Sequence, residues 1–443
     1  HKINDRMLSR GMKPVYQGFA GFVPEAMQKY YPEINLIETK WQGFKSRNML
    51  SPLDSLFSVI GTAFIKEWEK EFGKGKYYLI DSFNELEIPF GEKGTQERYD
   101  GLRNYGEILY KSLADANPDA VWVMQGWMFG YHRNYWDPES VSALLSGAPD
   151  GKLMVIDLAV DFNEFVWRSE KSWDYLDGFH GKEWIFSTVP NFGGRSALTG
   201  ALDFYANGHL QAIDSPNKGR LTGYGTSPEG IEQNDVIYEI IAQAGWSRDS
   251  INMEEWLHGY SLARYGKCPE GIDRFWGEMR QSAYNTFTNH ARFKWQMRPL
   301  FQRKQMMGIN EHYFTAIESF LSCAAEMPES ETYRADAVMY AAMYLSAKAD
   351  NLLDAINWAY QKGDRRRAEE LETRLVQILT DADRLLESHP VLRLERWLDK
   401  ARAAATNPEE EERFGTEARR LISVWGCPSL HDYSPRVWAG FIR

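Results

Sequence analysis

The sequence predicts an α/β domain followed by an all-α domain, and three observations support this. Up to about residue 245, short apolar runs alternate with longer amphipathic stretches, as in a parallel sheet or barrel with helices outside it. From about Trp246 onward the pattern changes to long helical stretches with few β-branched runs. A chain of 443 residues also exceeds the size that one hydrophobic core usually serves. We therefore expect two domains, residues 1–245 and 246–443.

Six strands are expected in the first domain, because six short runs rich in Val, Ile or aromatic residues end near Gly, Pro, Asn or Asp. These runs are Pro14–Phe19, Tyr77–Phe83, Ala120–Gln125, Leu153–Leu158, Trp184–Val189 and Arg220–Tyr224. Amphipathic helices are expected between the first three, at Leu56–Phe72 and Tyr99–Ala116. Six strands are fewer than a closed barrel needs. We expect a (β/α)8-type (TIM) barrel that lacks its first strands, which would precede His1.

Helices dominate the expected second domain, and no repeat of fixed period is evident. Aromatic residues on these helices are expected to fill the core. The predicted helices are Met253–Tyr265, Ile272–Phe287, Glu311–Cys323, Thr332–Lys362, Arg365–Leu386 and Pro408–Trp425.

Charge and composition exclude several classes of partner. The formal net charge of −11 argues against nucleic acid or an anionic membrane as the main partner. No apolar run reaches 18 residues, so no membrane span is expected. The three cysteines and nine histidines show no metal-ligand spacing, and we expect neither a metal nor an organic cofactor. Self-association into a homo-oligomer is left open.

Aromatic residues make up 14% of the chain, which permits two interpretations. Large rings fill large cores. Flat rings also line sugar-binding clefts, because the C–H faces of a pyranose pack against them. Composition by itself favours the core.

The segment Asp81–Pro89 is the first candidate for chemistry, because an apolar strand runs directly into acids and an amide. Side chains at the carboxyl ends of barrel strands converge on the active site. Glu85 is suited to act as a general acid there, and Asn84 to hold a sugar hydroxyl or acetamido group. The alternative is a loop of solvated acids.

The segment Gly223–Gly230 is the second candidate, since Glu229 again follows a short strand. Its glycines would permit close approach to a ligand. The alternative is a turn before a helix with an acid in its first turn. Together the two segments supply the pair of carboxylates that most glycosidases place on either side of the scissile bond. Neighbouring acids that compete for these roles are Glu87, Glu232, Asp81 and Asp235.

Further cleft candidates stand at other strand ends or loops, namely Trp41, Trp127 and Asn191. Each is equally explained as a residue that fills the rim of a barrel.

At these segments the sequence resembles glycoside hydrolase family 89, the α-N-acetylglucosaminidases. The matching stretches, in the family's order, are Arg10–Val15, Gly21–Ala26, Asp81–Glu85, Ala120–Phe129, Asn191–Gly194 and Pro228–Asn234. The resemblance implies a barrel followed by a helical domain, and retaining hydrolysis of terminal, non-reducing α-linked N-acetylglucosamine. It places the acid/base on Glu85 and the nucleophile on Glu229. It also assigns Asn84, Trp41, Trp127 and Asn191 to the substrate pocket.

The resemblance further implies a glycan partner, such as heparan sulfate or another host glycan, and no cofactor. Bacterial members are exported to the periplasm or secreted, and animal members act in lysosomes. The chain looks like a bacterial member that lacks N-terminal and C-terminal segments. Two alternatives stay open: a retaining glycosidase of other sugar specificity, and a non-catalytic glycan-binding relative inactivated by truncation.

Overall fold

A computed structural model describes residues 1–39, 47–81, 83–87, 89–190, 192, 198–229, 234–287, 293 and 308–423. The chain divides into two compact units. The first contains His1–Val189 and His209–Ser227, and the second contains Pro190–Gly208 and Pro228–Arg443.

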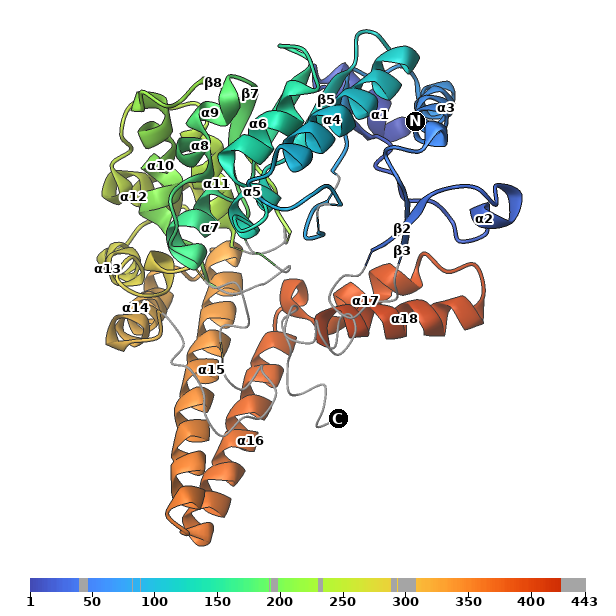
Figure 1. Ribbon diagram of the computed structural model, residues 1–443. Coiled ribbons are helices and arrows are strands. Elements are labelled where there is room, and N and C mark those ends of the chain that lie inside the picture. The colour runs from blue at the N-terminus through green and yellow to red at the C-terminus, as the bar shows by residue number, and fades with distance from the viewer. Residues whose placement is uncertain are drawn as a thin grey trace. The chain divides into compact units, whose positions relative to one another are not determined.

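A six-stranded parallel sheet forms the centre of the first unit (Figure 1). Its strand order, β1-β4-β5-β6-β7-β8, follows the chain. Each strand pairs in parallel with the next, so all six carboxyl ends meet at one edge. The strands are β1 (Val15–Gln17), β4 (Tyr77–Leu79), β5 (Val121–Gln125), β6 (Leu153–Asp157), β7 (Glu183–Thr188) and β8 (Arg220–Thr226). All six predicted strands are confirmed. The antiparallel pair β2 (Leu36–Thr39) and β3 (Arg47–Leu50) was not predicted.

The central strand β5 is buried because apolar residues face both sides of the sheet there, whereas the edge strands β1 and β8 are partly exposed. In β5, Val121, Trp122, Val123 and Met124 are all at most 4% exposed. The Trp122 indole N–H donates to the Ile80 carbonyl oxygen at 2.9 Å, which satisfies the one polar atom of a fully buried ring. For this tryptophan the core interpretation is confirmed.

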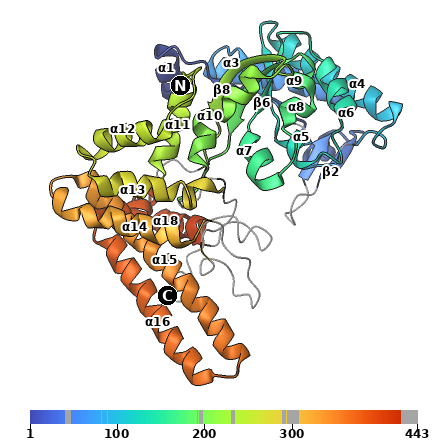
Figure 2. The same ribbon diagram turned by 90° about the vertical axis from the view of Figure 1, so that its left-hand side faces the viewer.

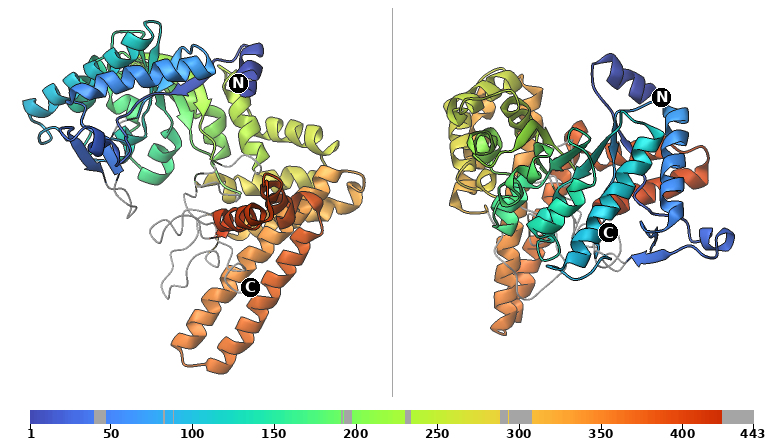
Figure 3. Two further views of the ribbon diagram at one scale, coloured as in Figure 1. Left: turned by 90° about the vertical axis from the view of Figure 1, so that its right-hand side faces the viewer. Right: turned by 45° about the horizontal axis from the view of Figure 1, so that its top comes forward.

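Helix α4 packs against both α3 and α6 in this unit (Figure 3). Side-chain caps start them, since Asp54, Thr95 and Asp137 each accept a backbone N–H of the first turn. The helices of this unit are α1 (Lys2–Ser9), α2 (Met27–Tyr30), α3 (Ser55–Phe72), α4 (Gln96–Ala116), α5 (Trp127–Tyr131), α6 (Pro138–Ser146), α7 (Val160–Phe162), the π-helix Asn163–Trp167, α8 (Ser172–Tyr175) and α9 (Asp177–His180). The next helix, α10 (Leu202–Asp214), follows β7 in the chain.

The second unit is helical, as predicted, and α15 and α16 form a long antiparallel hairpin (Figure 2). Its helices are α11 (Asp235–Ala244), α12 (Met253–Tyr265), α13 (Glu270–Met279), α14 (Glu311–Ser322), α15 (Glu331–Gln361), α16 (Arg365–Glu387), α17 (Leu394–Arg402) and α18 (Pro408–Ser423), with short 3-10 turns at Ala283–Asn285, Cys323–Glu326 and Pro390–Leu392. The predicted helix Ile272–Phe287 was too long, because α13 ends at Met279. Helix α17 was not predicted.

Aromatic residues of these helices form the core of the second unit, as expected. Phe275 packs 4.9 Å from Phe320 and 4.8 Å from Tyr340 between ring centroids. A partly buried ion pair joins α12 to α15, since Asp336 accepts from Arg264 Nε at 2.7 Å and Nη2 at 2.9 Å. Among the described residues, no helix is both long and apolar enough to cross a membrane.

Candidate active site

Glu85 lies in a tight turn just beyond the carboxyl end of β4. Phe83 and Glu85 both have left-handed backbone conformations, with φ values of 59° and 55°. Non-glycine residues adopt this conformation at a cost and do so mainly where the surrounding structure holds them. Phe83 supplies that hold, because it is 2% exposed and its ring packs 5.2 Å from Tyr105. The turn thereby fixes Asn84 and Glu85 at the edge of the sheet.

The side chain of Glu85 is oriented by Trp127, from the next strand connection. The Trp127 indole N–H donates to Glu85 Oε1 at 2.9 Å. Aromatic neighbours fix the indole in turn, since its ring lies 4.8 Å from Phe162 and 4.9 Å from Trp167. Burial lowers the pKa of the adjacent His132 against the opposing charge of Glu85. The carboxylate therefore lies half-buried, beside an indole donor and an imidazole whose pKa is lowered by burial.

Asn84 is half-buried in the same turn. Its Oδ1 atom is buried, and none of the described residues donates a hydrogen bond to it. A buried amide oxygen without a donor is costly. Asn84 is thus suited to accept a hydrogen bond from a bound ligand.

Asp81 ties the ends of two strands together rather than facing outward. Its carboxylate accepts the Gln125 backbone N–H at 2.9 Å and the Gln125 side-chain amide at 3.1 Å. Burial raises the pKa of Asp81 to about 6, although both hydrogen bonds lower it. These contacts give Asp81 a structural role and weaken its case as the catalytic acid.

Two further buried acids, which the sequence reasoning did not single out, lie at the end of β6 and in the short helix α7 that follows it. Asp161 accepts the Val189 backbone N–H at 3.1 Å and so anchors the end of β7. Asp157 is fully buried, and none of the described residues gives either oxygen a well-formed hydrogen bond. Burial raises the pKa of Asp157 to about 8, although the Trp173 backbone N–H and Arg133 lower it. The sequence did contain a signal for both residues, because Asp157 and Asp161 each directly follow a short apolar run.

Glu229 follows β8 and is exposed. Gly223 and Gly225 of the preceding strand do not have left-handed backbone, and their expected role in the approach of a ligand stays a prediction. A Cβ atom added at either position would lie 3.4 Å from the Ile185 side chain, which is an ordinary van der Waals distance. The nucleophile assignment and the Glu85–Glu229 separation stay predictions, since the two residues belong to different compact units.

The competing acids have distinct environments. Asp235, at the start of α11, forms an ion pair with Arg264 of α12 at 2.8 Å, and this contact joins the two helices. Glu87 is exposed. Trp41, Asn191 and Glu232 lie outside the described residues, and their predicted roles stay predictions.

Comparison with known proteins gives consistent matches along the whole chain. Residues 1–248 match the "Alpha-N-acetylglucosaminidase (NAGLU) tim-barrel domain" and residues 256–443 match the corresponding C-terminal domain. The chain is 29% identical to the human protein named alpha-N-acetylglucosaminidase, over 100% of this chain and 59% of that one.

Solved structures of a family 89 glycoside hydrolase from Clostridium perfringens are similar in fold. They share 25% identity and a TM-score of 0.84, and cover 99% of this chain and 50% of theirs. One contains 2-acetamido-1,2-dideoxynojirmycin and another contains PUGNAc. The chain therefore spans between half and three-fifths of the length of these relatives.

Proposed function

The chain belongs to the α-N-acetylglucosaminidase family, glycoside hydrolase family 89, and on this premise we propose that it removes terminal α-linked N-acetylglucosamine from glycans. The proposed reaction is hydrolysis with retention of configuration, carried out by two carboxylates.

In the proposed first step, the Glu229 carboxylate attacks the anomeric carbon while Glu85 donates its proton to the leaving glycosidic oxygen. The product is a covalent glycosyl-enzyme and a released alcohol. In the second step Glu85, now a carboxylate, takes a proton from water, whose oxygen attacks the anomeric carbon and frees Glu229. A retaining enzyme of this type holds its carboxyl groups about 5–5.5 Å apart.

The observation that carries the proposal is the contact between Trp127 and Glu85. The indole N–H holds one carboxylate oxygen at 2.9 Å, in a turn with two left-handed non-glycine residues. A general acid must be held in a fixed direction relative to the leaving oxygen, because a small displacement costs much of the rate. The contact with Trp127 supports this assignment, because it fixes the direction of the Glu85 carboxylate.

Similar proteins support the class of substrate. A Clostridium perfringens relative with two glutamate-to-glutamine substitutions is solved with its substrate GlcNAc-α-1,4-galactose. That structure has a TM-score of 0.84 and 25% identity with this chain. For this chain we propose Asn84 and Trp127 as substrate contacts, together with Trp41 and Asn191. Export and a natural glycan such as heparan sulfate remain predictions of the family resemblance.

The test is turnover of an aryl α-N-acetylglucosaminide by the Glu229→Ala variant. We expect loss of activity and partial rescue by azide, which would take the place of the carboxylate and yield the β-glycosyl azide. Glu87→Gln is the matched control, since it removes an exposed acid two positions from Glu85, and should keep full activity. Ordinary turnover by Glu229→Ala would contradict the assignment.

The sugar preference is tested separately. Rates on aryl α-glucosides and α-galactosides, measured beside the N-acetylglucosaminide, would reveal a retaining glycosidase of other specificity. Tight binding of 2-acetamido-1,2-dideoxynojirmycin without any turnover would instead favour a non-catalytic glycan-binding protein.

A further inference from the structure

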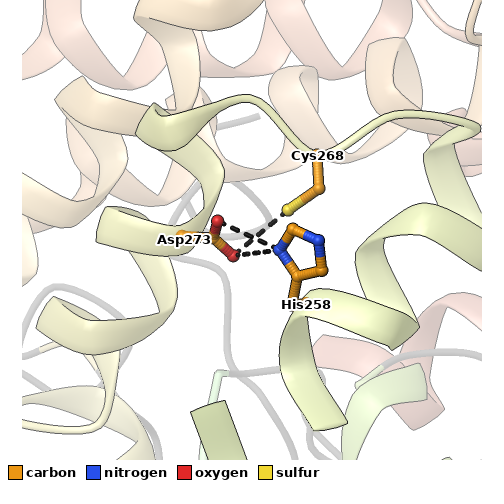
Figure 4. Close-up of side chains that lie close together, drawn as sticks. All are labelled: His258, Cys268 and Asp273. Atoms are coloured by element: carbon orange, nitrogen blue, oxygen red, sulfur yellow. Dashed lines mark hydrogen bonds and ion pairs between the residues drawn. The ribbon is translucent and has the colours of Figure 1, made fainter. Parts of the chain in front are cut away.

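Three side chains with metal-ligand chemistry converge between two helices of the second unit. They are His258 on α12, Cys268 in the following loop and Asp273 in the first turn of α13 (Figure 4). In the described part of the chain, these are the only three such side chains whose ligand atoms all lie within 4.8 Å of one another. None of them takes part in the proposed glycosidase chemistry.

The contacts in this cluster run through the carboxylate. The His258 Nδ1 atom lies 3.0 and 3.1 Å from the two oxygens of Asp273. The Cys268 thiol donates to Asp273 Oδ1 at 3.2 Å. In a tetrahedral zinc site with bonds of about 2.0–2.3 Å, neighbouring ligand atoms are about 3.3–3.6 Å apart. The separations of His258 and Cys268 from the Asp273 carboxylate are thus a few tenths of an ångström short of that geometry, and the His258 and Cys268 ligand atoms lie within 4.8 Å of each other.

The backbone supports this convergence. Asn252 caps α12, and Gly266, with φ of 81°, ends it in the left-handed conformation that turns the chain back. Behind the cluster, the buried Ser261 hydroxyl accepts the Trp276 indole N–H at 2.8 Å, which joins α12 to α13. The three ligand-bearing segments are therefore fixed before any ion binds.

The surroundings are open and acidic. His258 and Asp273 line a pocket of about 500 Å³ that also contains Glu254, Glu255 and Arg280. The positive charge of Arg280 is already engaged, because it pairs with Asp203 at 2.7 Å. On the other side, Cys268 lines a second pocket of about 480 Å³. A cation would thus have a solvent route to the cluster and a negative field around it.

We propose that His258, Cys268 and Asp273 bind a divalent transition-metal ion of the zinc class. A nitrogen, sulfur and oxygen donor set favours such an ion over magnesium or calcium, which take oxygen ligands. With three protein ligands, the fourth position faces the pocket and is filled by water or by Glu254 or Glu255. The ion joins α12 to α13 at the surface of the helical unit.

Binding requires a rearrangement of protons. The thiol proton leaves to solvent, and the imidazole proton moves to Nε2 so that Nδ1 can coordinate. Without an ion, burial and then the Asp273 hydrogen bond raise the pKa of the Cys268 thiol to about 12. The thiol is then protonated, and its hydrogen-bond partner is a carboxylate rather than an imidazole. A cysteine nucleophile needs the thiolate form, so Cys268 is unsuited to that role.

The test uses the full 443-residue chain after dialysis against a chelator, titrated with Zn²⁺ by calorimetry and with Co²⁺ by absorption. We expect one ion per chain and a sulfur-to-cobalt charge-transfer band. Cys268→Ser should abolish the band, and Cys268→Ser and Asp273→Asn should each weaken Zn²⁺ binding by more than about tenfold. Circular dichroism of each variant establishes that it is folded.

Matched controls remove similar groups from the same unit. His312→Ala removes an imidazole that pairs with Glu278 at 2.6 Å and has no thiol partner among the described residues, and Cys323→Ser removes a buried thiol. Both should keep the stoichiometry and the affinity. The proposal is overturned if the folded wild-type chain binds no Zn²⁺ at metal concentrations on the order of 100 micromolar. It is also overturned if the cobalt charge-transfer band persists in Cys268→Ser.

Discussion

The edge of the sheet and the α12–α13 pair both gather polar side chains, but by opposite means. At the sheet edge, Asp81 and Glu85 follow β4 whereas Trp127 follows β5, and hydrogen bonds between the two connections hold them. Between α12 and α13, three side chains from positions 258 to 273 meet at the surface. The difference teaches that parallel topology builds a rigid site from distant segments, whereas a helical turn builds an exposed one from nearby segments.

The largest effect is expected at the sheet edge, from Glu85→Gln. If Glu85 is the general acid, kcat/KM on an unactivated α-N-acetylglucosaminide should fall by about 10²–10⁴-fold. A substrate with a strongly acidic phenol as leaving group needs less protonation and should lose less. The measurement is a comparison of the two substrates. Equal losses on both would show that Glu85 does not donate the proton.

Within the helical unit, Asp336→Asn should cost the most stability. This buried carboxylate accepts two hydrogen bonds from Arg264 and one from Tyr265 at 2.8 Å. A hydrogen bond to a charged group contributes about 1.5–3 kcal/mol, and Arg264 would keep its ion pair with Asp235, so we expect a loss of a few kcal/mol. Urea denaturation provides the measurement. Glu369→Gln, which breaks an exposed pair with Arg365, is the control and should change stability by less than about 1 kcal/mol.

Asp157→Asn should reveal the cost of a buried acid through its pH dependence. Since the pKa of Asp157 is raised to about 8, the folded chain keeps a proton that the unfolded chain releases above about pH 4. Rising pH therefore favours unfolding of the wild type across this range, by a few kcal/mol at ~1.4 kcal/mol per pKa unit. The variant lacks this pH-dependent loss of stability, so its melting temperature relative to that of the wild type should rise from pH 4 to pH 8.

Asp150→Asn is the control of opposite sign. Lys182 lowers the pKa of Asp150, so this acid stabilises the fold at neutral pH, and the contribution disappears on acidification. The stability deficit of Asp150→Asn should shrink toward low pH. A pH-independent difference for Asp157→Asn would contradict the assigned burial cost.

Trp127→Phe should separate orientation from packing. Phenylalanine keeps a ring against Phe162 and Trp167 but removes the donor to Glu85, and a hydrogen bond to a charged group contributes about 1.5–3 kcal/mol. We expect kcat/KM to fall by roughly tenfold or more. Trp122→Phe loses an indole hydrogen bond to Ile80 instead, and should lower the melting temperature with little effect on turnover. Similar kinetics in both variants would contradict the orienting role.

The smallest effect is expected for Asp273→Asn in chelated protein. Asp273 and His258 are 44% and 47% exposed, and an exposed pair contributes about 0–1 kcal/mol. The melting temperature should hardly change without metal, whereas Zn²⁺ should raise it in the wild type alone. A large metal-independent loss would show that the cluster is a structural contact.

Strand prediction succeeded because each strand carries its signal locally. The runs from Val121 and from Leu153 each have four apolar residues followed by a polar one, which is the pattern of buried parallel strands. Helix α17 was missed because it is short and strongly charged, with Leu398 its one residue classed as buried. The hairpin β2–β3 was missed because its strands are four residues long and only partly apolar.

The sequence by itself determined the family, the order of the strands and the placement of Glu85 after β4, because motifs and apolar periodicity are properties of adjacent residues. Tertiary structure alone decided that Trp127 faces Glu85, that Asp81 is bound to Gln125, and that Asp157 is buried without a well-formed hydrogen bond. It also brought His258, Cys268 and Asp273 together at intervals that match no ligand motif. Direction and burial of a side chain depend on the packing of segments distant in the chain, which no local pattern encodes.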